Sequence, residues 1–285
     1  MLNILFTIIF SSILYVVFKI FKILNINIFQ AIVCNYFFAS FLGLYFSETP
    51  FQFSEISYKS WFPFAIIIGV LFVTVFNVMA KTILVTNLTV ASVASKMSMV
   101  IPALFGILIL KEPTSLFLWI GLFLAIISVY FVSKKPNESF TISHFGFPIL
   151  LFLGSGTVDT LINVTQHSYL NKSETALFSG FAFLFAFLSG FSVLLFLFFI
   201  KKQHFALKNL IAGLFLGIPN YFSLYFTTRS LQIDTLSSAT IFTILNIGVI
   251  LLTTLIGLLF FKEKLYKLNY IGILLALIAL FLVTQ

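Results

Sequence analysis

Charged residues are scarce in this chain of 285 residues, since Asp, Glu, Lys and Arg together make up 8% of it. Soluble domains carry roughly a quarter charged residues, so this composition excludes an ordinary soluble fold. The single cysteine, Cys34, excludes an internal disulfide, and three histidines in separate regions offer no metal-ligand spacing. The sequence contains no HExxH, no GxSxG and no glycine-rich phosphate loop. We therefore expect no enzyme active site, no metal and no cofactor.

Hydrophobic residues are abundant instead, at 61% of the chain, and Phe alone occurs 40 times. This proportion is typical of an integral membrane protein, in which most of the Phe side chains are expected to face lipid. A net charge of +8 could indicate nucleic-acid binding. However, the Lys residues are scattered in short loops and form no basic stripe with interleaved aromatic residues, so no nucleic-acid partner is expected.

Ten apolar stretches, each near the roughly 20 residues that cross about 30 Å of hydrocarbon, are separated by short polar segments. Only helices satisfy their own backbone groups in lipid at this length, so the sequence predicts an all-α integral membrane protein. The first stretch has no basic leader and no cleavage site, which predicts a retained helix. The predicted transmembrane helices are 2–21, 27–46, 62–82, 89–110, 116–133, 146–168, 175–200, 208–228, 236–260 and 268–284.

One apolar segment occurs twice. KEPTSLFLWIGLFLAIISVYFV, from Lys111, aligns without a gap with KEKLYKLNYIGILLALIALFLV, from Lys262, at an offset of 151 residues (262 − 111). The ten predicted helices repeat in the same order, at offsets that run from 144 (146 − 2) to 152 (268 − 116). Because five is odd, the second copy must enter the bilayer from the opposite side. The sequence therefore predicts ten transmembrane helices as two inverted five-helix repeats, at 1–135 and 144–285.

The fourth and ninth predicted helices resemble those of EamA-type members of the drug/metabolite transporter superfamily. Each runs from a start rich in Ser, Thr and Ala, at 89–94 and 235–240, to a terminal Lys-Glu, and a Gly-containing final helix follows. The resemblance covers the whole chain in two copies. It implies a ten-helix bundle with an inverted repeat, a central cavity lined by the first, third and fourth helices of each half, and cytoplasmic termini. It also implies transport of amino acids or related metabolites.

The charge distribution favours the opposite orientation. Eleven cations lie in odd-numbered loops against four in even-numbered loops, which places both termini outside by the positive-inside rule. The eleven are Lys19, Lys22, Lys81, Lys134, Lys135, Lys201, Lys202, Lys208, Lys262, Lys264 and Lys267, and the four are Lys59, Lys111, Lys172 and Arg229. Both orientations stay open. In either one, we expect a multi-pass protein of a bacterial-type inner (plasma) membrane, as a monomer or homodimer.

Lys96 and Asp159 are the ionisable residues expected well inside the hydrocarbon, where a charge costs several kcal/mol unless it faces a partner or water. Lys96 precedes Pro102, which removes a backbone hydrogen bond and can kink the helix. Lys96 therefore faces a cavity or, alternatively, extends to the nearer interface. Asp159 is too short to reach an interface, and Asn163 follows it on the same helical face. Asp159 faces substrate or a coupling proton, or else is held in a permanent hydrogen bond or an ion pair with Lys96.

Neutral polar residues form a second candidate set. Asn77 and Asn220 lie at similar depths in the third helix of each half, since 220 − 77 = 143 is close to the repeat offset. Buried Asn requires a hydrogen-bond partner, so these residues line a cavity or join neighbouring helices. Tyr221 and Asn246 are assigned to the same lining, and Pro219 is a second expected kink.

Two further motifs are expected to be structural. Gly213 and Gly217 form a GxxxG pattern in the eighth predicted helix, which favours tight helix packing. The Lys-Glu pairs at 111–112 and 262–263 lie at helix ends, where we expect interfacial ion pairs or gate contacts.

The predicted function is secondary transport of a small polar or amphipathic metabolite, such as an amino acid, by alternating access between two inverted halves. Lys96 would attract a carboxylate or phosphate, and Asp159 an amine or a coupling proton. Two alternatives stay open. One is a flippase for lipid-linked sugars with the same fold, and the other is a non-transporting membrane scaffold or receptor. The expected partners are a small-molecule substrate and membrane lipid.

Overall fold

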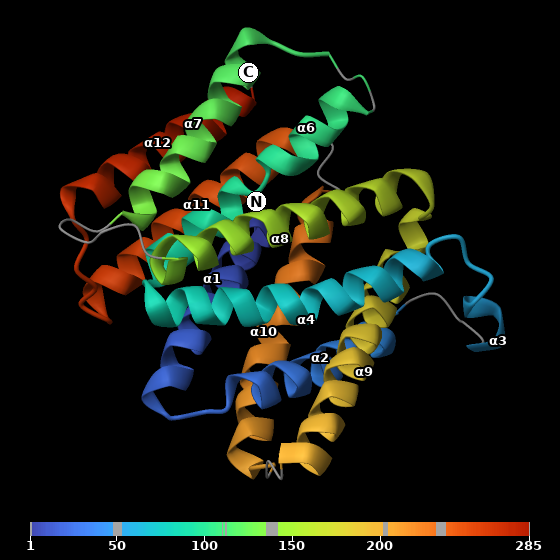
Figure 1. Cartoon of the computed structure of the whole chain (residues 1–285). Helices are drawn as coiled ribbons and strands as arrows, with labels where there is room; N and C mark the ends of the chain where they lie inside the picture. Colours follow the sequence, from blue (N-terminus) through green and yellow to red (C-terminus); the bar gives the residue numbers. More distant parts are fainter. Residues whose placement is uncertain are drawn as a thin grey trace. The chain divides into compact units, whose positions relative to one another are not determined.

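The computed structural model describes residues 2–47, 53–109, 111, 113–134, 142–201, 205–231 and 238–284. Within these ranges every regular element is a helix (Figure 1). The long helices are α1 (Leu2–Ile23), α2 (Ile28–Tyr45), α4 (Phe62–Val85), α7 (Leu116–Ser133), α8 (Ile142–Ser168), α9 (Thr175–Lys201), α10 (Leu207–Leu231), α11 (Ser238–Leu259) and α12 (Lys267–Val283). The shorter helices are α3 (Phe53–Ile56), α5 (Leu88–Met97), α6 (Val100–Leu108) and the 3-10 helix η1 (Lys172–Glu174).

The helices confirm the membrane class that composition predicts. Among the described residues, nine segments are long and apolar enough to cross a bilayer, with α5 and α6 together forming one of them. α12, with 17 residues, is a shorter apolar helix at the place of the tenth predicted span. The nine segments and α12 follow the predicted order. The predicted end of the first half, at residue 135, lies outside the described residues.

The fourth predicted span is interrupted four residues before its proline. α5 and α6 are separated by a turn at Ser98 and Met99. Pro102 has no N–H, so the Ser98 carbonyl lacks its ordinary helical donor and accepts instead from the Ile101 N–H, at 2.9 Å. One helix expected over 89–110 is therefore two helices joined by a tightened turn.

The chain forms two compact units, and each combines segments from both halves of the sequence. Unit 1 consists of Met1–Lys19, Val78–Thr157 and Ser223–Gln285, and it contains α5, α6, α7, α11 and α12. Unit 2 consists of Ile20–Asn77 and Val158–Phe222, and it contains α2, α3, η1 and α9. Within each unit, helices of the first half pack against their counterparts from the second half.

α7 and α12, the fifth helices of the two halves, lie side by side in unit 1 (Figure 1). A Cβ added to Gly121 would lie 3.0 Å from the Ala279 carbonyl oxygen, and one added to Gly272 would lie 2.9 Å from that of Ser128. Each contact joins the start of one helix to the end of the other, so the pair is antiparallel. The two contacts are equivalent, because 272 − 121 and 279 − 128 are both 151. Such reciprocity indicates a local two-fold axis, as inverted repeats require.

α2 and α9, the second helices, repeat this arrangement in unit 2. A Cβ added to Gly43 would lie 2.8 Å from the Gly180 Cα, and one added to Gly190 would lie 2.7 Å from Val33 Cγ2. These contacts are again equivalent, since 190 − 43 and 180 − 33 are both 147. Small residues at such points let two backbones approach closely in a membrane. The inverted architecture is therefore visible within each unit as antiparallel pairing of equivalent helices.

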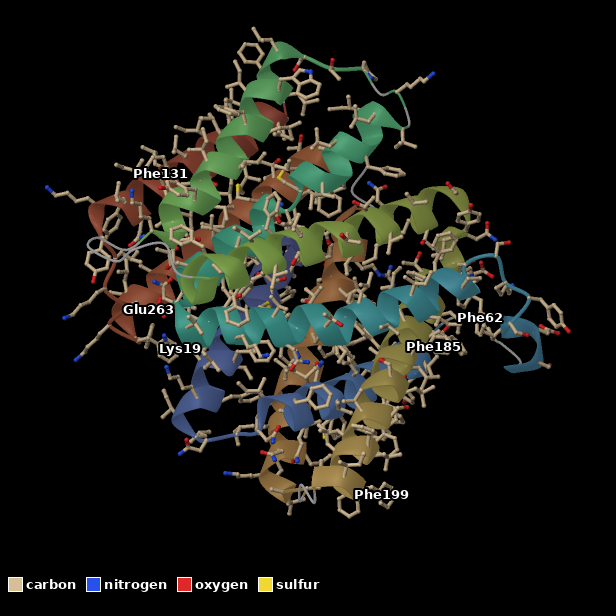
Figure 2. All side chains as sticks on the ribbon, viewed as in Figure 1. Lys19, Phe62, Phe131, Phe185, Phe199 and Glu263 are labelled. Atoms are coloured by element: carbon tan, nitrogen blue, oxygen red, sulfur yellow. The ribbon has the colours of Figure 1, made fainter. Side chains whose placement is uncertain are left out.

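Unit 2 has an aromatic core where α9 meets the start of α4. Trp61 is 1% exposed, and its ring lies edge-on to Phe178 with 5.8 Å between the ring centroids. Phe62 meets Phe185 at 5.4 Å (Figure 2). Phe199, in contrast, is exposed and points away from neighbouring helices near the end of α9 (Figure 2). Such outward Phe side chains suit a helix face that meets acyl chains.

Candidate functional site

α5 and α11, the fourth helices of the two halves, pack together in unit 1 through polar side chains. Thr253 Oγ1 donates to Ser92 Oγ at 2.8 Å, and Asn246 Nδ2 donates to Met99 Sδ at 3.8 Å. The second contact joins counterparts, because 246 − 99 = 147 equals the offset between the predicted starts of these helices (236 − 89). Met99 and Asn246 therefore lie at the local two-fold axis, and Met99 belongs to the turn that separates α5 from α6.

Lys96 lies in the last turn of α5, immediately before this turn, and its side chain is half-buried. A cation at the end of a helix is favoured by the partial negative charge of the carbonyl groups there. The hydroxyl of the preceding Ser95 lies 3.3 Å from that of Ser155 in α8. We call these residues the unit 1 polar seam: Ser92, Ser95, Lys96, Met99, Ser155, Asn246 and Thr253. One cation beside hydroxyl and amide groups can bind the carboxylate or phosphate of a small solute.

Asp159 and Asn163 lie one turn apart on α8, and both side chains are exposed. They belong to unit 2, whereas Lys96 belongs to unit 1. The rest of this helix is apolar enough to be counted among the nine candidate membrane spans. An exposed carboxylate on such a helix is stable only where it meets water or a polar partner.

The Asn residues of the two third helices, α4 and α10, have different partners. Asn77 Nδ2 donates to the Val73 carbonyl oxygen of its own helix, at 2.8 Å. Asn220 Nδ2 donates to Asn35 Oδ1 of α2, at 3.1 Å, and both of these residues are buried. Asn220 therefore joins α10 to α2 in unit 2, one of the two interpretations that the sequence left open. Asn35 is a partner that the sequence did not single out.

The GxxxG pattern lies on the same interface between α10 and α2. Cβ atoms added to Gly213 and Gly217 would lie 2.9 Å and 2.8 Å from carbonyl oxygens of α2, which confirms the predicted tight packing. Pro219 lies inside α10, and the helix continues through it. Tyr221 is buried, and its ring stacks on Phe46 with 5.9 Å between centroids.

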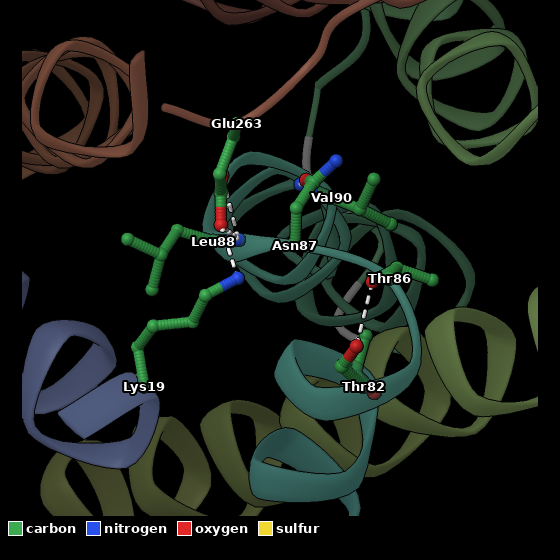
Figure 3. A network of polar contacts seen from close by, with 7 residues as sticks. All are labelled: Lys19, Thr82, Thr86, Asn87, Leu88, Val90 and Glu263. Atoms are coloured by element: carbon green, nitrogen blue, oxygen red, sulfur yellow. Dashed lines mark hydrogen bonds and ion pairs between the residues drawn. The ribbon is translucent and has the colours of Figure 1, made fainter. Parts of the chain in front are cut away.

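Glu263, in the segment after α11, is the centre of a second polar group in unit 1 (Figure 3). Its Oε1 accepts from Lys19 Nζ at 2.7 Å and from the Leu88 backbone N–H at 3.0 Å. Leu88 is the first residue of α5, where N–H groups lack helical partners and the helix dipole is positive. Asn87 caps the same end, because its side chain accepts from the Val90 N–H at 2.8 Å (Figure 3). Of the expected Lys-Glu motif at 262–263, Glu263 does form an ion pair, and its partner is Lys19 of α1 and not Lys262.

Two neighbouring residues give Glu263 this position. Lys262 has a positive φ of 49°, which turns the chain at the end of α11. A Cβ added to Gly257 would lie 2.6 Å from Glu263 Oε2, so the absence of a side chain there lets the carboxylate fold back over the helix. Lys111, the counterpart of Lys262, also has a positive φ, of 56°. The two copies therefore share this turn, although residue 112 lies outside the described residues.

Comparison with known proteins identifies relatives over almost the whole chain. The model of the EamA-like transporter family matches residues 1–134 and residues 146–285. A protein of Haemophilus influenzae (strain ATCC 51907 / DSM 11121 / KW20 / Rd), described as an uncharacterized protein, is 30% identical over 286 residues, which cover 98% of this chain and 96% of that protein. A protein of known crystal structure has 14% sequence identity and a TM-score of 0.61, with 99% of this chain and 95% of that chain covered. At this identity the likeness concerns the fold alone.

Proposed function

The chain belongs to the EamA-like transporter family, and from this premise we propose that it is a secondary transporter for a small polar or amphipathic metabolite, such as an amino acid. The observation that carries this proposal is the unit 1 polar seam, which gathers a lysine, hydroxyls and an amide where α5 packs against α11, beside the turn that separates α5 from α6. Secondary transporters with inverted repeats hold their substrates near interrupted helices at the repeat interface. Alternating access would then expose the seam to either side of a bacterial-type inner membrane in turn.

The candidate residues of each unit have distinct proposed roles. Lys96 would attract the carboxylate or phosphate of the substrate through a charge-assisted hydrogen bond. Asn246 would supply a neutral donor next to it. Asp159, exposed on α8 in unit 2, would carry a coupling proton or bind an amine, and Asn163 would hydrogen-bond the same group.

Counterflow in liposomes tests this function. Vesicles containing the purified protein would be loaded with an unlabelled amino acid, and the entry of the labelled amino acid would be measured for a panel covering each side-chain class. We expect Lys96→Met to slow counterflow of its substrate about tenfold or more, because a hydrogen bond to a charged group contributes about 1.5–3 kcal/mol. Lys264→Met, at an exposed lysine in the loop after α11, is the matched control and should transport normally.

The outcomes separate the parts of the proposal. Absence of counterflow for every amino acid in the panel would show that the substrate class is wrong. Normal counterflow by Asp159→Asn at all pH values would remove Asp159 from substrate binding and proton coupling. Faster movement of a fluorescent lipid-linked sugar between leaflets than in protein-free vesicles would favour the flippase alternative.

A further inference from the structure

An apolar groove of about 320 Å³ lies in unit 2 between α2, α9 and the start of α10. Its wall on α9 runs from Phe187 through Phe191 to Phe198, at spacings that place these rings on one helical face. The separation of 11 positions from the first to the last (198 − 187) corresponds to a length of about 16 Å along the helix. α2 contributes Val33 and Cys34 to the opposite wall. The groove therefore extends along α9, and its lining is almost entirely hydrocarbon.

The two ends of the groove lie at different depths along the helices. Phe37 and Phe187, which line the inner end, meet at 5.3 Å between ring centroids near the middle of their helices. At the other end α2 begins, α9 ends and α10 begins, because α2 and α9 are antiparallel. The groove thus runs from a helix-end region to mid-helix over about 16 Å, which is about half of the roughly 30 Å hydrocarbon thickness of a bilayer. This is the depth of one leaflet.

The polar groups described at the outer end have hydrogen-bond partners within the protein, and one of these groups is a cation. Gln30 Oε1 accepts from Asn209 Nδ2, and Asn209 Oδ1 accepts from the Asn27 N–H at 3.1 Å. Lys208, beside this amide network, is exposed and donates to the Asn25 carbonyl oxygen at 2.9 Å. Lys208 forms no ion pair with a carboxylate among the described residues. Lys208 therefore places a positive charge in the helix-end region where the groove opens, two residues before the lining residue Leu210.

The equivalent position in the other repeat is filled by protein side chains. At the offset of 147 between α2 and α9, Cys34 corresponds to Phe181 (181 − 34). The third helices are offset by 148 (217 − 69), since Cβ atoms added to Gly69 and Gly217 would each lie 2.8 Å from the carbonyl oxygens of the counterparts Ala182 and Asn35. Trp61 therefore corresponds to Asn209 (209 − 61). Trp61 and Phe181 are buried, with 6.0 Å between their ring centroids, in the aromatic core between α9 and α4. One copy of the repeat thus fills this space with two aromatic rings, whereas the other copy has a small thiol and an amide and keeps an open groove.

We propose that the groove binds one acyl chain of an anionic phospholipid, with the lipid phosphate at Lys208. The walls of the groove lie partly on the surface of unit 2, since Phe37 is 47% exposed and Phe198 is 50% exposed. In a membrane-spanning chain the molecules that meet these walls are lipids. The length of the groove matches one leaflet, its lining matches hydrocarbon, and Lys208, a cation described at its outer end, matches a phosphate. This lipid site is independent of the transported substrate.

Native mass spectrometry of the detergent-solubilised full-length protein tests the proposal. The protein would be titrated with dioleoylphosphatidylglycerol and, separately, with dioleoylphosphatidylcholine, which has the same chains and no net charge. We expect one phosphatidylglycerol to bind at least about tenfold more tightly than phosphatidylcholine, since a charge-assisted contact contributes more than 1.4 kcal/mol. Lys208→Gln should abolish this preference, and the control Lys264→Gln should retain it.

A filling variant tests the groove itself. Cys34→Phe introduces the ring that the other repeat carries at the equivalent position, and it should remove the tight phosphatidylglycerol adduct. Its unfolding transition, measured in the same detergent, checks that the variant is folded. Equal binding of the two lipids by the wild-type protein would overturn the proposal. Unchanged binding of phosphatidylglycerol by a folded Cys34→Phe variant would overturn it as well.

Discussion

Substitution of Glu263 tests how the segment after α11 holds α1 and α5 in unit 1. Glu263→Gln removes the ion pair with Lys19 but keeps an oxygen that can accept from the Leu88 N–H, whereas Glu263→Ala removes both contacts. A hydrogen bond to a charged group contributes about 1.5–3 kcal/mol, and an acceptor at a helix N-terminus about 1 kcal/mol. We expect the free energy of unfolding to fall by about 2 kcal/mol in Glu263→Gln and by about 3 kcal/mol in Glu263→Ala.

Burial predicts an asymmetry between the two partners of this ion pair. The Glu263 side chain is 4% exposed and that of Lys19 is 20% exposed. Lys19→Met leaves a nearly buried carboxylate without its cation, whereas Glu263→Gln leaves an ammonium group that can turn towards a polar environment. Lys19→Met should therefore be the more destabilising single substitution. The double variant Lys19→Met/Glu263→Gln removes both charges and should be more stable than Lys19→Met alone.

Equilibrium unfolding in mixed micelles, followed by circular dichroism at increasing mole fraction of a denaturing detergent, measures these free energies. Lys264→Met, one residue from Glu263 and exposed, is the matched control and should lie within about 0.5 kcal/mol of the wild type. The reasoning would be refuted by a Glu263→Ala variant as stable as this control. A double variant less stable than Lys19→Met would also contradict it, because the carboxylate would then be stabilising without its cation.

Three further predictions use the same unfolding assay. Gly272→Ala should lower the free energy of unfolding by about 2 kcal/mol or more, because the added Cβ would lie 2.5 Å from a backbone nitrogen of α7. An unchanged free energy of unfolding would refute this close packing. Asn220→Leu should cost about 1 kcal/mol, with partial recovery when Asn35→Leu is added, because the first change leaves a buried amide without its donor. The hydrogen bond from Lys59 holds the pKa of the Glu174 carboxyl below its ordinary value. The ion pair between Lys59 and Glu174 should therefore stabilise the fold above about pH 4.3, the pKa of Glu in the unfolded chain, and this stabilisation should disappear as the pH falls through the lower pKa of the folded state. The free energy of unfolding of Lys59→Met should fall less over the same pH range.

Hydropathy predicts the helices of this chain well because bilayer thickness fixes the length of an apolar span. The predicted start at 116 and the end at 133 are those of α7 in the structure. The interruption at Ser98 and Met99 lies between the predicted limits of one span, because apolar side chains continue through it. Pro102 was the available signal, and the place of the turn follows from the missing hydrogen bond to the Ser98 carbonyl.

Partners across helices could not be predicted from a single sequence. Lys19 and Glu263 are 244 residues apart, and their ion pair depends on how α1 meets the segment after α11. The contacts of Ser155 and Thr253 with other helices could not be predicted either, because isolated hydroxyls are common in membrane helices, where they often form hydrogen bonds with their own backbone. Thr253 shows both behaviours, since its hydroxyl contacts the Val249 carbonyl at 2.7 Å and the Ser92 hydroxyl at 2.8 Å. Which bond crosses to another helix depends on helix rotation, and rotation is fixed by packing.

The internal repeat separates two kinds of contact by their distance from the local two-fold axes. A contact away from an axis occurs twice, so both copies need a residue that permits it, as Gly121 and Gly272 do for α7 and α12. A contact on an axis occurs once, so its two members can differ, as Met99 and Asn246 do in the seam. A position whose counterpart has a different chemistry therefore does not take part in a packing contact that both copies need. The polar seam and the groove at Cys34 are both built from such positions, which is why we assign the protein's ligands to them and not to the glycine contacts that hold the repeats together.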